Sequence, residues 1–153
     1  MPFYINLGDR MFVKDAMAKK VVSIEHDKTV LDACNKYKEC RLGSLVVVNS
    51  EVIVGIITER DIIERVIVNK KNPKKTKIEE IMSKNIITIH TSAKIEQAAE
   101  LMRKHKIKKL PVILNNEFVG IITVTDIANI MPNSTKILAD KNQPFNFVTP
   151  ESY

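Results

Sequence analysis

The sequence has few of the residues and segments that mark secreted, membrane-spanning or metal-binding proteins. Its 153 residues include two cysteines, Cys34 and Cys40, and three histidines, His26, His90 and His105. The cysteines are too few for a disulfide scaffold or a thiolate metal site, and the histidines do not have the spacing of metal ligands. No apolar run approaches the ~20 residues that span a bilayer, and the first residues lack the apolar stretch of a signal peptide. We therefore expect a reduced, cytoplasmic protein.

The short motifs of common enzyme classes are also missing. There is no G-x-S-x-G elbow, no Walker A loop and no H-E-x-x-H pair, and Cys40 has no evident base beside it in the sequence. We expect a protein that is not an enzyme, without a catalytic cofactor or a metal.

The sequence has fewer acidic than basic residues, 18 against 24. The formal net charge is +6 and the isoelectric point is near 9.3, which permits contact with phosphates, nucleic acid or anionic membrane and selects none of them. The basic residues gather in two places, of which one precedes residue 78 and the other follows residue 102: Lys70, Lys71, Lys74, Lys75 and Lys77, then Arg103, Lys104, Lys106, Lys108 and Lys109. Such a run is most often a solvated surface.

What the chain does have is an internal repeat. GIITERDI at residues 55–62 returns as GIITVTDI at residues 120–127, and the same offset pairs Met17 with Met82 without a gap. We divide the chain into an N-terminal segment (1–12), a first repeat (13–67), a lysine-rich linker (68–77), a second repeat (78–131) and a C-terminal tail (132–153). Neither repeat alone would bury much surface, so we expect a shared core.

Each repeat predicts the order strand, helix, strand, strand, helix. The β-branched runs 21–24 and 86–89 indicate the first strands, and Asp27 and Ser92 are candidate N-caps of the helices that follow. The apolar runs 45–48 with 52–58, and 111–114 with 118–123, predict hairpins. The second helices follow Thr58 and Thr123.

This order, the duplication and the G-h-x-[ST]-x-x-[DN] signature at Gly55–Asp61 and Gly120–Asp126 together resemble the CBS domain pair, also called a Bateman module. The resemblance covers nearly the whole chain apart from its ends. It implies an α/β (α+β) fold with two β-α-β-β-α units related by a pseudo-two-fold axis. It also implies a homodimer of two such pairs, with contacts through the second helices.

The sequence T-x-x-D permits two interpretations at Thr58-Asp61 and at Thr123-Asp126. A threonine N-cap with an acid three residues later is a capping box, which satisfies the backbone N–H groups of the first turn. The same carboxylate can accept hydrogen bonds from ribose hydroxyls, while the helix start and the threonine hydroxyl suit a phosphate. For one motif alone the structural interpretation is the commoner one.

The family resemblance implies that the aspartate holds ribose and that each cleft is completed by the other repeat. Apolar residues would abut the base and backbone groups would read its edge. In one cleft Thr58 and Asp61 would work with Met82, Ile87, Lys108 and Lys109. In the other, Thr123 and Asp126 would work with Met17, Val22, Gly43 and Ser44. Arg60 could contact phosphate in either cleft, and Ile121 and Thr125 are further candidates.

The two repeats differ where ligands would be discriminated. Lys108 and Lys109 of the second repeat correspond to Gly43 and Ser44 of the first, so the predicted Asp61 cleft has cations for phosphate and the Asp126 cleft lacks them. We expect AMP, ADP or ATP to prefer the Asp61 cleft.

The leading hypothesis is therefore a regulatory adenine-nucleotide sensor that acts on a separate partner protein. An S-adenosylmethionine-type ligand would use the same ribose contact and remains an alternative. A nucleic-acid-binding protein that uses the linker and the basic helix is another alternative, although the sequence has no helix-turn-helix, finger or aromatic stacking motif.

Overall fold

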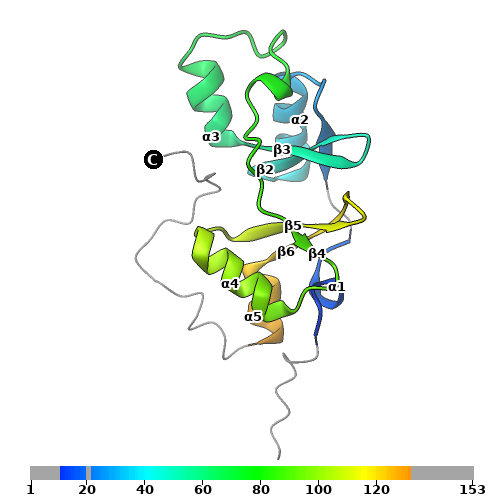
Figure 1. Ribbon diagram of the computed structural model, residues 1–153. Coiled ribbons are helices and arrows are strands. Elements are labelled where there is room, and N and C mark those ends of the chain that lie inside the picture. Colours follow the sequence, from blue (N-terminus) through cyan, green and yellow to red (C-terminus); the bar gives the residue numbers. More distant parts are fainter. Residues whose placement is uncertain (1–10, 20–21, 132–153) are drawn as a thin grey trace, which may run out of the picture. The chain divides into compact units, whose positions relative to one another are not determined.

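The computed structural model describes residues 11–19 and 22–131 (Figure 1). The predicted C-terminal tail and most of the predicted N-terminal segment lie outside these residues. Contact clustering divides the chain into two compact units. The repeat-1 unit contains residues 22–86 and 116–118, and the described part of the repeat-2 unit contains residues 11–19, 87–115 and 119–131.

The repeat-1 unit consists of a strand, a helix, a hairpin and a second helix. β1 (Ser23–Glu25) runs parallel to β2 (Ser44–Asn49), which pairs antiparallel with β3 (Val52–Thr58). α2 (Val30–Cys40) joins β1 to β2, as Figure 1 shows. α3 (Glu59–Ile62) continues directly into a π-helical turn (Ile63–Ile67), and a 3-10 turn (Ile78–Glu80) follows the linker.

The repeat-2 unit has the same order, preceded by the short helix α1 (Val13–Ala16). β4 (Ile89–His90) runs parallel to β5 (Lys109–Leu114), and α4 (Ile95–His105) joins them. β6 (Glu117–Thr123) leads into α5 (Val124–Ile130). The strands form a six-stranded mixed sheet, and the order of hydrogen-bonded neighbours is β1-β2-β3-β6-β5-β4. The predicted fold class, a mixed α/β tandem pair, is thus confirmed.

Each unit contains a short segment from the other repeat. Ser83 exchanges two backbone hydrogen bonds with Ile56 of β3, at 2.8 and 2.9 Å. Ala18 exchanges the equivalent two with Ile121 of β6, at 2.8 and 3.0 Å. Residues 18 and 83 correspond at the offset of 65, so the duplication is present in the hydrogen bonds as well as in the sequence.

The core of each unit is built from the same apolar positions. In α2 the buried side chains are Val30, Ala33 and Tyr37, which the helical period places on one face. In β2 four consecutive residues, 45–48, are buried, as in a strand covered on both sides. The corresponding buried residues of the repeat-2 unit include Ile95, Ala98, Met102, Leu110 and Val112.

Two local predictions were wrong. The helix N-caps are Thr29 and Lys94, not Asp27 and Ser92, because the chain makes a turn before each helix begins. Oγ1 of Thr29 accepts the backbone N–H of Asp32, so the cap is made two residues later than predicted. The run 86–89 contributes only Ile89 to β4, so most of that β-branched run makes no strand.

Candidate functional site

The first predicted station, Thr58 with Asp61, lies where β3 ends and α3 begins. Oδ2 of Asp61 accepts hydrogen bonds from the backbone N–H and from the hydroxyl of Thr58, both at 2.8 Å. Oγ1 of Thr58 in turn accepts the backbone N–H of Asp61 at 3.2 Å. The capping box is therefore complete, and it holds the carboxylate in one orientation with an exposed fraction of 13%.

The second station, Thr123 with Asp126, has the same geometry at the junction of β6 and α5. Its three hydrogen bonds measure 2.8, 2.8 and 3.2 Å between the equivalent atoms. Two copies of one strand-to-helix junction thus present two carboxylates held by the same capping box.

A methionine lies against the glycine that opens each signature. A Cβ added to Gly55 would overlap the thioether of Met82, and a Cβ added to Gly120 would lie 2.8 Å from Sδ of Met17 and from the carbonyl oxygen of Ala18. Only glycine admits these approaches. The structure therefore brings Met82 into the unit that holds Asp61, and Met17 into the unit that holds Asp126.

The loops before β2 and β5 lie beside the station of their own repeat. The carbonyl of Gly43 accepts the N–H of Glu59 at 3.1 Å, and Ser44 pairs with Thr58. In the repeat-2 unit the carbonyl of Lys108 accepts the N–H of Val124 at 2.9 Å. The prediction that Lys108, Lys109 and Ile87 complete the Asp61 cleft, and that Val22, Gly43 and Ser44 complete the Asp126 cleft, joins residues of different units and stays a prediction.

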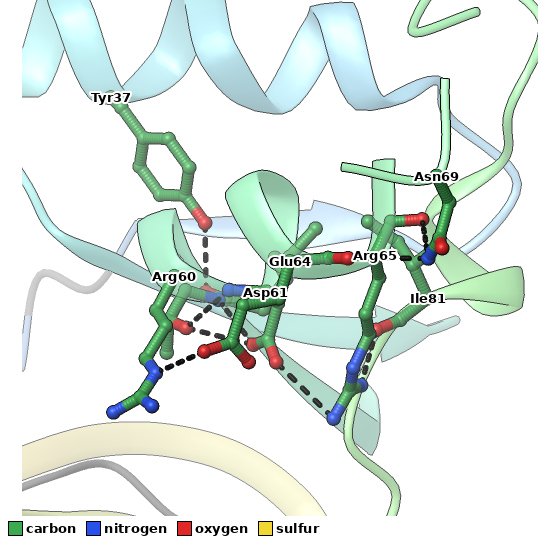
Figure 2. A network of polar contacts seen from close by, with 9 residues as sticks. Tyr37, Arg60, Asp61, Glu64, Arg65, Asn69 and Ile81 are labelled. Carbon is green, nitrogen blue, oxygen red and sulfur yellow. Dashed lines mark hydrogen bonds and ion pairs between the residues drawn. The ribbon is translucent and has the colours of Figure 1, made fainter. Parts of the chain in front are cut away.

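Arg65 and Tyr37 add polar contacts around the first station, beyond the capping box (Figure 2). Nη2 of Arg65 lies 3.3 Å from Oδ1 of Asp61, and Nη1 of Arg65 donates to the carbonyl of Ile81 at 2.6 Å. The hydroxyl of Tyr37 donates to the carbonyl of Ile57 at 2.8 Å. Burial raises the pKa of the Tyr37 hydroxyl, and the nearby charge of Asp61 adds to this effect.

The remaining polar side chains offer no metal centre among the described residues, where no group of three or more potential ligands gathers. His26 lies 2.8 Å from Oε2 of Glu79, and Nδ1 of His90 lies 2.8 Å from Oγ of Ser92. Burial raises the pKa of the Cys34 thiol, which packs against the core of its unit as predicted. No helix in the described residues is long and apolar enough to cross a membrane.

A separate cavity of about 500 Å³ lies beside β1 and contains none of the predicted site residues. Nζ of Lys36 donates to the carbonyl of Ser23 at its edge, at 2.5 Å. Its lining is Ser23, Ile24, Glu25, Lys28, Asp32, Asn35, Lys36 and Val48.

Comparison with known proteins decides the family. Residues 13–68 and 78–133 each match the CBS domain family. The chain is a CBS domain protein. Its two CBS domains cover the two repeats that carry the stations.

This CBS domain protein is similar in sequence or in structure to several known proteins. It is 32% identical over 124 residues to the CBS domain-containing protein YhcV of Bacillus subtilis, a match that covers 80% of this chain and 88% of YhcV. It is similar to the CBS domain pair of protein MJ0100 in complex with 5′-methylthioadenosine and S-adenosyl-L-methionine (TM-score 0.68, 30% identity, 81% and 98% of the two chains). It is also similar to the hexameric CBS-CP12 protein from bloom-forming cyanobacteria (TM-score 0.65, 29% identity, 82% and 74%).

Two residues beside the first station of this CBS domain protein were missed in the sequence, namely Arg65 and Tyr37. A comparison of the two repeats could have identified them, because Arg65 corresponds to Ile130 and Tyr37 corresponds to Met102. A charged or hydroxylated side chain that replaces an apolar one in an otherwise matching repeat indicates a contact that only one copy makes.

Proposed function

We propose that this CBS domain protein binds adenosine-containing ligands through Asp61 and Asp126 and regulates a partner protein in response. The observation that carries the proposal is the pair of capped carboxylates at equivalent strand-to-helix junctions, each in a unit where a methionine lies against the glycine of the signature. Because the capping box fixes each carboxylate before a ligand arrives, little side-chain freedom would be lost on binding.

The chemistry of a carboxylate suits a ribose. An ionised carboxylate offers roughly four acceptor positions, and the capping box uses two of them on Oδ2. The 2′- and 3′-hydroxyls of a ribose are adjacent donors that match the positions left over. Met17 and Met82, which lie in the same units as the two aspartates, would pack against the base, as would Val22, Ile87 and Ile121.

AMP, ADP and ATP are the ligands we favour, with phosphate contacts from Arg60, Lys108, Lys109 and Thr125. The basic side chains among these suit phosphate oxygens. S-adenosylmethionine-type ligands share the ribose contact, and the MJ0100 pair was determined with two ligands of this class.

Capping geometry by itself does not carry the proposal, because Thr29 and Asp32 form the same capping box at the start of α2. Their three hydrogen bonds measure 2.9, 2.8 and 3.2 Å. That box begins the first helix of the repeat and lacks the glycine and methionine found beside the stations. It therefore provides a control in which a capping aspartate is removed away from the proposed ligand.

Calorimetric titration of the wild-type protein with a series of ligands tests the ligand class. We expect AMP, ADP or ATP to bind, and 2′-deoxyadenosine phosphates to bind at least about tenfold more weakly, since one hydrogen bond to a charged group is lost. Equal affinity for ribose and deoxyribose forms would contradict the ribose contact, and preference for S-adenosylmethionine would select the alternative ligand.

Regulation in this proposal acts through differential binding, with a second copy of the chain as the first partner. A ligand shifts an equilibrium only if it binds two states with different affinities. The second helix of the first repeat exposes Ile63, Ile67 and Val68, with exposed fractions of 57%, 59% and 68%. Apolar side chains gathered in this way favour a homodimer contact through this helix.

A further inference from the structure

Arg65 makes the two proposed ribose stations unequal. Its guanidinium contacts Oδ1 of Asp61, whereas the corresponding position in the repeat-2 unit holds Ile130, which has no donor. We infer that Arg65 competes with the ribose for Asp61, so that Asp126 is the stronger ribose station. The inference rests on the proposed function, since it concerns the ligand of the same carboxylates.

Counting acceptor positions gives the physical basis. Thr58 occupies two of the roughly four positions of the Asp61 carboxylate, and Arg65 faces a third. A ribose presents two hydroxyl donors, so it meets about one open position at Asp61. At Asp126 the equivalent helix residue brings no cation, and two hydroxyls can be accepted.

The backbone contact explains why Arg65 stays at this position. Nη1 of Arg65 donates to the carbonyl of Ile81 at 2.6 Å, which is a short bond between a charged donor and a backbone acceptor. The contact with Asp61 is longer, at 3.3 Å, and the Arg65 side chain is 40% exposed. Arg65 is thus anchored by Ile81 and only loosely held by Asp61, so a ribose can displace it at a moderate cost.

The effect opposes the preference predicted from the sequence, in which Lys108 and Lys109 favour the Asp61 cleft. Those lysines would act on phosphate, whereas Arg65 acts on the ribose. Adenosine separates the two effects because it has the ribose and no phosphate.

The test measures adenosine binding by calorimetry in full-length proteins with one station removed. In the Asp126→Ala background only Asp61 remains, and we expect Arg65→Met to strengthen adenosine binding about twofold to fivefold, the range for a partly exposed ion pair. Arg65→Gln keeps a donor for the Ile81 carbonyl and should give a similar gain. It serves as the second variant if Arg65→Met lowers the unfolding midpoint.

Lys36→Met in the same background is the matched control. It also removes one positive charge and one side-chain bond to a backbone carbonyl, but it lies at Ser23, away from the station. We expect it to leave adenosine affinity unchanged. Asp61→Ala, which leaves only Asp126, should bind adenosine more tightly than Asp126→Ala.

Two different failures are distinguishable. If the Asp61→Ala/Asp126→Ala protein loses adenosine binding, and neither Arg65 variant strengthens binding in the Asp126→Ala background, the competition by Arg65 is wrong while the proposed function stands. If adenosine and AMP bind to the Asp61→Ala/Asp126→Ala protein as to the wild type, the proposed function is wrong and the inference falls with it.

Discussion

Tyr37 is the buried side chain that ties α2 to the end of β3, one residue before the first station. It is 7% exposed, and its hydroxyl donates to the carbonyl of Ile57. A phenol in this position is favoured in its neutral form, because burial and the Asp61 charge both raise its pKa. The folded state therefore holds the Tyr37 proton more tightly than the unfolded state does.

The first prediction follows from that shift. Tyr37→Phe should lower the free energy of unfolding by about 1 kcal/mol near neutral pH through loss of the hydrogen bond. The contribution of a raised pKa is fully present below the unfolded value of about 10 and is lost as the pH rises above it. Urea unfolding of both proteins between pH 7 and 11 should show their difference narrowing above about pH 10.

If the difference in unfolding free energy between the two proteins stays constant or widens across that range, the raised pKa of Tyr37 is contradicted. The comparison is made between two proteins that share all other titrating groups, so alkaline effects of lysine cancel.

How far single residues could be predicted depended on the distance between contact partners in the sequence. Thr58 and Asp61 are three residues apart, so the spacing alone predicted their contact, and it is confirmed. Arg65 contacts Ile81 and Tyr37 contacts Ile57 across 16 and 20 residues. Those contacts depend on the folded unit, and only the mismatch between the repeats pointed to them.

Among the elements, the hairpins and the second helix of each repeat were well predicted, and the start of the first helix of each repeat was not. The hairpin strands alternate or run apolar over six or seven residues, a signal that survives without tertiary information. The helix starts required a choice between several capping residues within three positions. Asp27 and Thr29 both qualify by type, and the contact with Asp32 decides for Thr29.

The turn between β2 and β3 gives the second prediction. Ser50 and Glu51 have φ angles of 48° and 72°, in the left-handed region that favours asparagine and glycine. Ser50→Asn/Glu51→Gly should raise the free energy of unfolding by about 0.5–1 kcal/mol, because the strain at the turn is relieved.

The other hairpin supplies the control for this turn. Asn115 and Asn116 have φ angles of 50° and 66°, and asparagine already tolerates them. We measure both changes by urea unfolding. Asn116→Gly should raise the free energy of unfolding by less than Ser50→Asn/Glu51→Gly does. An equal or larger gain at Asn116 would show that residue type is not what limits the first turn.

At the scale of the whole molecule, the duplication was visible in the sequence. That each unit contains a short segment from the other repeat was only partly predicted. The family resemblance placed Met82 with Asp61 and Met17 with Asp126, and each pair does lie in one unit. The linker is a hydrogen-bonded loop, in which the carbonyl of Asn72 accepts from the N–H groups of Lys75 and Thr76, and its sequence did not predict this. Such contacts come from the folded loop, because lysine-rich composition alone indicates only a solvated surface.

The exposed apolar side chains of the second helix in repeat 1 give the third prediction. Ile67→Glu should convert a dimer to monomers, because it places a charge in the proposed contact. Light scattering across a range of concentrations measures the mass. Leu114→Glu adds the same charge at an apolar residue of 42% exposure on β5 and should leave the mass unchanged. A wild-type monomer, or an Ile67→Glu protein that stays dimeric, would contradict the proposed contact.

The central claim is that Asp61 and Asp126 hold a ribose, and its most direct test is AMP titration of the Asp61→Ala/Asp126→Ala protein beside the Asp32→Ala protein. All three positions form the same capping box, so Asp32→Ala shows what the loss of one such cap does away from the proposed ligand contacts. We predict that the double variant loses at least about tenfold in AMP affinity, since charged hydrogen bonds are removed, while Asp32→Ala binds AMP like the wild type. A double variant that binds AMP with wild-type affinity would contradict the account.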